Sequence, residues 1–164
     1  MSTIAELEEK VKELMNEIET LKREKKTEEF EYPFAENEYY FAISLDGDVT
    51  SSIWTNHKFD TTRYSQGNAF KTKQEAERER DKRALLTRFR QFRDKCNGDW
   101  KPDFEDGNSG KHYISLNHTT NMLRINFSYN LEDFNLFGYF RKESDAKRAI
   151  QLFGDEIKRL WVDE

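Results

Sequence analysis

The residues best suited to chemistry form a basic run between positions 77 and 95. The run holds eight lysine or arginine residues and four acidic residues, interleaved with two phenylalanines. An arginine guanidinium can bind phosphate through paired N–H groups, so the run could bind nucleic acid or a nucleotide signal. The alternative, which we favour, is a solvated helix whose cations pair with the interleaved carboxylates. The candidate partner-binding cations are Arg78, Lys82, Arg88, Arg90 and Arg93.

Residues typical of metal sites or of nucleophilic catalysis are few and scattered. The single cysteine, Cys96, falls at the C-terminal end of a predicted helix, where the helix dipole does not stabilise a thiolate, and is interpreted as a packed thiol. His57, His112 and His118 could bind a metal only with acidic neighbours. The sequence contains no phosphate-binding loop, dinucleotide fingerprint or hydrolase motif. We therefore expect no enzymatic activity, no metal and no cofactor.

A second candidate surface lies just before the basic run, between positions 54 and 64. Trp54 is assigned to the core. Arg63 and Tyr64 are of the residue types that anchor protein interfaces, so they are candidate partner-binding residues. They could equally cover the edge of the core, and both interpretations stay open.

The first 28 residues predict a dimerisation helix. Thr3 followed by Glu6 indicates a capping box at its start. Beyond it, apolar residues recur at intervals of three and four among charged residues, with Ile or Val at heptad position a and Leu at d. This pattern favours a parallel two-stranded coiled coil, with Glu17 facing Lys22 of the partner chain. The alternative is a helix packed on its own domain, but the narrow stripe favours self-association. The predicted dimerisation residues are Ile4, Leu7, Val11, Leu14, Ile18 and Leu21.

The rest of the chain predicts an α+β globular domain at 38–164, after a charged linker at 29–37. Two pseudo-repeats, 38–96 and 111–161, each have a β-β-β-α pattern and are related by an offset of about 70 residues. Asp46 and Gly47 predict the tight hairpin turn of the first repeat. We expect the two units to form an antiparallel sheet covered by helices.

The predicted elements of the two repeats correspond closely. In the first, strands at 39–45, 48–55 and 68–71 precede a helix from Thr72 to about Lys95, with Ala84 among its inward-facing residues. In the second, strands at 112–117, 122–129 and 139–141 precede a helix at 143–160, and Phe127 is expected on the inner face of the middle strand. The segment from 97 to 111 is glycine-rich and predicts an exposed loop.

Composition restricts the classes of protein to consider. The 164 residues include 35% hydrophobic and 36% charged residues, and the 14% of aromatic residues must supply much of the core. A net charge of −5 argues against general affinity for nucleic acid. One cysteine excludes an intrachain disulfide, and we recognise neither a signal peptide nor a membrane-spanning segment. We expect a cytoplasmic protein with no membrane partner.

Several short motifs of this chain form a series that resembles the signature of small accessory proteins from phages and prophages of Gram-positive bacteria. The resemblance covers residues 39–160 except near Asp103. The resemblance implies a phage gene product and no particular reaction. Proteins of this kind often bind and block a host defence component, including CRISPR nucleases. The motifs are Tyr39-Tyr40, Asp46-Gly47, Trp54, Arg63-Tyr64, Gly67-Asn68, Phe70-Lys71-Thr72, Glu75-Ala76 and a second series from Tyr139 to Glu156.

These observations lead to one functional hypothesis and one alternative. We favour a non-enzymatic phage accessory protein that binds and inhibits a host defence component such as a CRISPR nuclease. It would act as a homodimer, joined by the N-terminal coiled coil, in the host cytoplasm. The alternative is a protein that binds nucleic acid or a nucleotide signal through the basic helix 77–95.

Overall fold

The structure, a computed structural model, describes residues 3–27 and 32–163. This part of the chain is mixed α+β, as the predicted fold class requires. Its helices are α1 (Ile4–Thr27), α2 (Lys58–Ser65), α3 (Lys73–Asn97) and α4 (Glu143–Trp161). Its strands are β1 (Tyr39–Ile43), β2 (Val49–Ile53), β3 (Lys111–Asn117) and β4 (Met122–Ser128). None of these helices is both long enough and apolar enough to cross a membrane.

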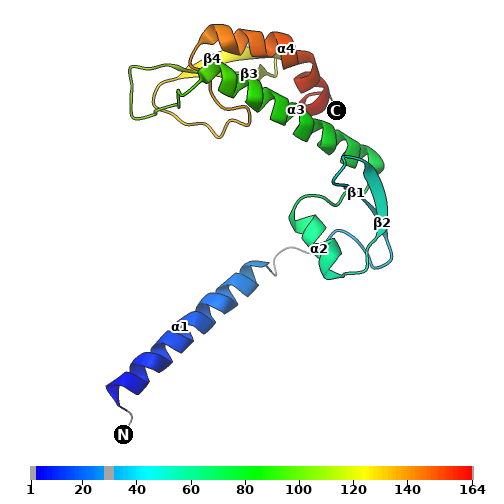
Figure 1. Ribbon diagram of the computed structural model, residues 1–164, viewed down its shortest axis with the longest axis vertical. Helices are drawn as coiled ribbons and strands as arrows, with labels where there is room; N and C mark the ends of the chain where they lie inside the picture. Colours follow the sequence, from blue (N-terminus) through cyan, green and yellow to red (C-terminus); the bar gives the residue numbers. More distant parts are fainter. Residues whose placement is uncertain (1–2, 28–31, 164) are drawn as a thin grey trace.

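Helix α1 is drawn apart from the rest of the chain in Figure 1. The predicted capping box starts it: the Thr3 amide donates to Glu6 Oε2 at 2.9 Å, and the Glu6 amide donates to Thr3 Oγ1 at 3.4 Å. These two bonds satisfy amides that have no partner within the helix. The helix then continues without glycine or proline for 24 residues.

Strands β1 and β2 form the first antiparallel hairpin. Ile43 pairs with Val49, and Gly47 takes the left-handed φ of 91° that the tight turn needs. The strands are shorter than predicted because the chain turns at Ser44, whose amide donates to the Asp48 carbonyl at 2.8 Å. Tyr40 and Ala42 point to one face and are fully buried, and Trp54, directly after β2, is also fully buried. Trp54 therefore belongs to the core, as the sequence predicted.

Strands β3 and β4 form a second antiparallel hairpin, and helix α4 packs on it. The register pairs Ile114 with Ile125, and Ile114 is buried against α4. The core of this second unit consists of Leu85, Phe89, Ile114, Phe140, Ala146, Ala149, Ile157 and Leu160. Two of these residues, Leu85 and Phe89, come from α3, so the second core is completed by the helix that follows the first hairpin.

Helix α3 connects the two units. It begins at the predicted capping box, where the Glu75 amide donates to Thr72 Oγ1 at 3.1 Å, and it ends at Gly98, whose φ is 56°. It packs against β1, β2 and α4. Figure 1 shows it running from the first hairpin to α4. At 1.5 Å per residue a helix of this size is about 37 Å long, so it can serve both units.

The predicted third strands are reduced to single bridges, and the predicted common sheet is replaced by two separate two-stranded sheets. Phe70 bridges Phe41 in the first unit, and Phe140 bridges His112 in the second. The chain cannot pair further because the N-caps of α3 and α4, Thr72 and Lys142, turn it into a helix two residues later. The two bridges lie at corresponding positions of the predicted repeats.

Two further parts of the first unit differ from the sequence expectation. Residues 58–65, for which no helix or strand was predicted, form α2, which His57 caps by accepting the Phe59 amide. Phe34, within the predicted linker 29–37, is only 6% exposed and packs with Tyr40 and Trp54. The packed structure therefore includes this end of the linker, while residues 28–31 lie outside the described part of the chain.

Two residues expected to face inward do not. Ala84 is exposed because α3 turns Leu85 and Phe89 toward α4 instead. Phe127 is 61% exposed on β4, since α4 covers Leu123 and Ile125 but does not extend over the end of the strand.

Replacing Phe34 with alanine should lower the free energy of unfolding by about 3–5 kcal/mol, because the buried ring leaves a cavity beside Trp54. Urea denaturation followed by circular dichroism measures the change. Tyr39→Ala is the matched control, since Tyr39 is 64% exposed. Equal effects of the two substitutions would show that the first core does not depend on residue 34.

Candidate binding surfaces

The apolar stripe of α1 is uncovered by the described residues of the chain. Spacings of three and four place its members on one face of the helix. Each member is at least half exposed, from 50% for Ile18 to 77% for Ile4. A face of this kind loses apolar contact with water when a second helix covers it. All six predicted dimerisation residues belong to it: Ile4, Leu7, Val11, Leu14, Ile18 and Leu21.

Charged residues flank this stripe. Lys10 and Glu17 occupy heptad position g, next to the apolar face, and both are exposed. In the predicted parallel dimer Glu17 would face Lys22 of the partner, but the side chain of Lys22 lies outside the described residues. Met15, at position e, is 65% exposed and widens the apolar face.

The cations of α3 do not form a single free face. Arg78 Nε donates to the Leu160 carbonyl at 3.1 Å, and Lys82 lies over the Trp161 ring at 5.6 Å. Arg88 pairs with Glu156 at 2.7 Å. These contacts hold α4 against α3. Three of the five predicted cations are therefore engaged within the fold.

Arg93 has a comparable structural role. Its Nη1 donates to the Phe137 carbonyl at 3.0 Å, and its Nη2 pairs with Asp94 at 2.7 Å. A side chain at Gly138 would collide with this guanidinium, and Gly138 has a φ of 70° that favours glycine. Arg93 thus fixes the chain just before Phe140.

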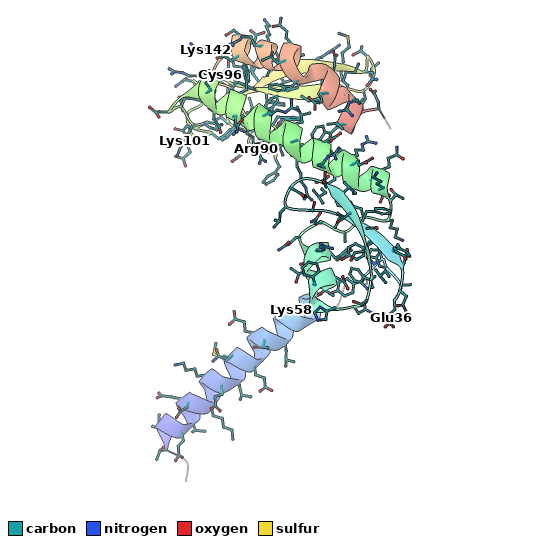
Figure 2. The ribbon with its side chains drawn as sticks, turned by 45° about the vertical axis from the view of Figure 1, so that its right-hand side comes forward. Glu36, Lys58, Arg90, Cys96, Lys101 and Lys142 are labelled. Carbon is teal, nitrogen blue, oxygen red and sulfur yellow. The ribbon has the colours of Figure 1, made fainter. Side chains whose placement is uncertain are left out.

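Arg90, labelled in Figure 2, is the predicted cation that stays available. It is exposed and makes no ion pair with any described residue. One free guanidinium does not provide the row of phosphate contacts that nucleic acid requires. The placement of these cations therefore favours the solvated, internally paired helix over the phosphate-binding alternative.

Arg63 and Tyr64 are used within the first unit. Arg63 Nη1 donates to the Tyr40 hydroxyl at 3.1 Å, and its guanidinium lies 4.4 Å from the centre of the Phe59 ring. Tyr64 is half-buried against the core formed by Phe34 and Trp54. Tyr64 therefore covers the edge of the first core. Arg63, besides its contacts within the fold, lines a groove on the surface of this unit.

This groove has a volume of about 590 Å³ and lies between the first hairpin turn and α2. Its most exposed apolar members are Leu45, at 110%, and Phe59, at 60%. Ile43, Arg63 and Asn68 also line it and are half-buried. Asn68 is fixed there because its side chain bonds to both the amide and the carbonyl of Ile43, at 2.9 and 2.8 Å.

A buried carboxylate links the elements around this groove. Asp60, 4% exposed, accepts the Tyr40 hydroxyl at 2.9 Å and the amide and hydroxyl of Thr55 at 3.0 and 2.8 Å. Burial acts to raise the pKa of the Asp60 carboxyl, but these hydrogen bonds together hold it below its ordinary value. The network fixes α2 to β1 and to the segment after β2, and Arg63 extends it through Tyr40.

The residues considered for metal binding and catalysis are not brought together. Among the described residues, no group of three or more histidine, cysteine, aspartate or glutamate side chains is placed to hold a metal ion. Cys96 packs against the second core, where burial and the nearby Asp145 raise the pKa of its thiol. Both effects disfavour the thiolate, in line with the packed-thiol interpretation.

The sequence analysis did not identify one exposed segment, the loop between β4 and Phe140. Phe134 in this loop is 106% exposed and Leu131 is 74% exposed. The available signal was a run from Leu131 to Leu136 in which three large apolar residues alternate irregularly with polar ones, with neither strand nor helix periodicity. Such residues, outside any regular element, are candidates for contact with a partner.

Asp60→Asn should destabilise the protein by about 1.5–3 kcal/mol near pH 7, because an amide cannot accept all the hydrogen bonds of the carboxylate. The folded pKa is below the unfolded value of about 3.9, so the ionised group stabilises the fold fully above that pH. This stabilisation is lost as the pH falls through the folded pKa. The stabilities of wild type and variant should therefore begin to approach one another below about pH 4 and should converge once the pH is below the folded pKa of Asp60. The exposed Asp155→Asn is the control, and a pH-independent difference for Asp60→Asn would contradict the assignment.

Comparisons of this chain with protein-family models, with curated proteins and with solved structures find no match.

Proposed function

We propose that the protein is a non-enzymatic binding protein that self-associates through α1 and inhibits a partner protein. The observation that carries the proposal is the apolar stripe of α1, half or more exposed along its length. A helix that leaves six regularly spaced aliphatic residues in water gains stability only when another surface covers them. A second copy of the same helix is the simplest occupant, because the stripe follows the heptad spacing of a coiled coil.

A dimer supports the inhibitor function by geometry. It presents two identical globular parts, so binding of the second part becomes intramolecular and the avidity exceeds the affinity of one part. Inhibition by occupancy needs no catalytic group. The resemblance to phage accessory proteins suggests a partner class: a host defence component such as a CRISPR nuclease, in the host cytoplasm.

The alternative function is binding of nucleic acid or a nucleotide signal through the basic helix. Arg90 supports it, as an exposed cation with no ion pair to the described residues. Against nucleic-acid binding, four of the candidate cations already contact α4 or the loop before Phe140: Arg78, Lys82, Arg88 and Arg93. We therefore place protein binding first.

Leu14→Lys should convert the dimer to monomer, because it places a charge in the middle of the apolar seam. Sedimentation velocity measures the change. Glu13→Lys is the matched control: it adds the same lysine at the adjacent position on the charged face, and the dimer should persist. Leu14→Pro should also give monomer, by breaking the helix. If both Leu14 variants remain dimeric, the self-association surface lies in the globular part.

Retention of a host protein from lysate tests the inhibitory function. The tagged full chain is immobilised, the lysate is treated with nuclease, and retained proteins are identified by mass spectrometry at low and high salt. We expect one defence nuclease or its complex to be retained after nucleic acid is digested, and its activity to fall when the purified protein is added. Nucleic acid retained at low salt without any protein would instead favour the alternative.

A further inference from the structure

The loop formed by residues 129–138, here called the Phe134 loop, exposes a large ring that the fold does not use. Phe134 is 106% exposed, Leu131 is 74% exposed and Leu136 is 46% exposed. Among the described residues no ring contact or cation contact involves Phe134. A phenylalanine with no intramolecular contact contributes nothing to folding stability, so its presence suggests another role.

The loop is held rigidly on both sides of this ring. The Asp133 amide donates to the Tyr139 hydroxyl at 2.8 Å, and the same hydroxyl bonds to the Asp133 carbonyl at 2.8 Å. On the other side, Asn135 Nδ2 donates to the Ile114 carbonyl at 3.2 Å, and Asn135 Oδ1 accepts the Phe137 amide at 3.0 Å. Tyr139 is itself buried. The backbone at Phe134 is thus fixed before binding, which reduces the entropy that a contact must overcome.

The two loops near the ring carry a net negative charge, because Lys101 and Lys111 are outnumbered by six carboxylates: Asp99, Asp103, Glu105, Asp106, Glu132 and Asp133. Glu132 and Asp133 precede Phe134 within the loop. The glycine-rich loop 98–110 lies beside it, since Phe104 stacks edge-on against Tyr139 at 5.1 Å and Lys111 Nζ bonds to the carbonyls of Asp106 and Tyr129 at 2.7 and 2.8 Å. Figure 1 shows both loops at the same end of the second unit. The side chains of Asp103, Glu105, Asp106, Glu132 and Asp133 make no ion pair with any described residue.

We propose that the Phe134 loop is the partner-binding surface and that the partner is a protein with a groove for single-stranded nucleic acid. Such grooves combine a cationic lining, which follows the phosphates, with aromatic side chains on which bases stack. A rigid ring flanked by carboxylates presents the features that such a groove binds in a nucleotide: a flat face to stack and negative charges beside it. Phe134 would take the place of a base, and the neighbouring carboxylates the places of phosphates. This inference deepens the proposed function and depends on it.

The groove of the first unit is a weaker candidate for the same role. Leu45 is as exposed as Phe134, but the two charged residues that line its groove, Asp46 and Arg63, have opposite signs, so the groove does not present a row of negative charges to a basic partner surface. Leucine is also uncommon among residues that dominate binding energy, whereas aromatic residues are enriched. Leu45→Ala therefore serves as the matched control for Phe134→Ala.

The experiment compares four immobilised full-length proteins in nuclease-treated host lysate: wild type, Phe134→Ala, Phe134→Tyr and Leu45→Ala. Proteins retained by wild type are then challenged with single-stranded oligothymidylate longer than about 16 nucleotides, which fills a typical binding site. A buffer of equal ionic strength without oligonucleotide is the control. For a retained protein that is then purified, biolayer interferometry gives the affinity of each variant.

We expect oligothymidylate, and not the matched buffer, to release the retained protein. Phe134→Ala should weaken binding at least about 30-fold, as for a residue that dominates an interface, while Phe134→Tyr and Leu45→Ala should bind as wild type does. All variants should keep the wild-type circular dichroism, because the altered side chains are exposed.

The contrary outcomes are distinguishable. If wild type retains no protein, the proposed function fails and this inference fails with it. If Phe134→Ala binds as wild type does, or only Leu45→Ala loses the partner, the proposed function stands and this surface is wrong. If Phe134→Ala loses the partner but oligothymidylate does not release it, the assigned class of partner is wrong.

Discussion

The fold depends on the packing of α3 against the first hairpin and α4. A two-stranded sheet is marginal on its own in water, and each sheet of this protein has only two strands and one bridge. Leu85 and Phe89, both fully buried, supply the α3 side of the second core, and the fully buried Ala76 lies near its start. A single long helix thereby packs against both small units. This arrangement also explains why so charged a chain can form two cores from large aromatic residues.

The same constraint determines where a partner can bind. Because α3 holds α4 partly through Arg78, Lys82 and Arg88, these cations are occupied by the fold. The sequence pattern of these cations would be the same if they bound phosphate or a neighbouring helix. The position of α4 in the structure shows that they contact a helix. Surfaces outside the two cores stay available for contact, among them the stripe of α1, the groove beside Leu45 and the Phe134 loop.

Local signals in the sequence predicted local structure well. The capping boxes at Thr3 and Thr72 and the Asp46–Gly47 turn depend on neighbours within four residues, and the structure contains all three. Features that depend on distant residues were not predictable. Helix α2 has no apolar periodicity and is fixed by Asp60, whose partners are Tyr40 in β1 and Thr55 in the segment after β2. The loss of the third strands likewise follows from competition between strand pairing and helix capping at Thr72 and Lys142. Phe134 was missed because only the folded loop distinguishes an exposed ring from a core ring.

The proposed self-association and the proposed role of the Phe134 loop complement one another energetically. A stable protein–protein interface usually buries about 1,200–2,000 Å² in total, and a single short loop around one ring supplies only part of that. Two copies joined through α1 would offer two Phe134 loops, which could bind one partner assembly or two sites along the groove of one partner. The second contact then forms at an effective concentration set by the connection between α1 and the globular part. A rigid anchor of modest area and a separate dimerisation helix are therefore a consistent combination, since the loss of either would weaken binding far more than its own contact area suggests.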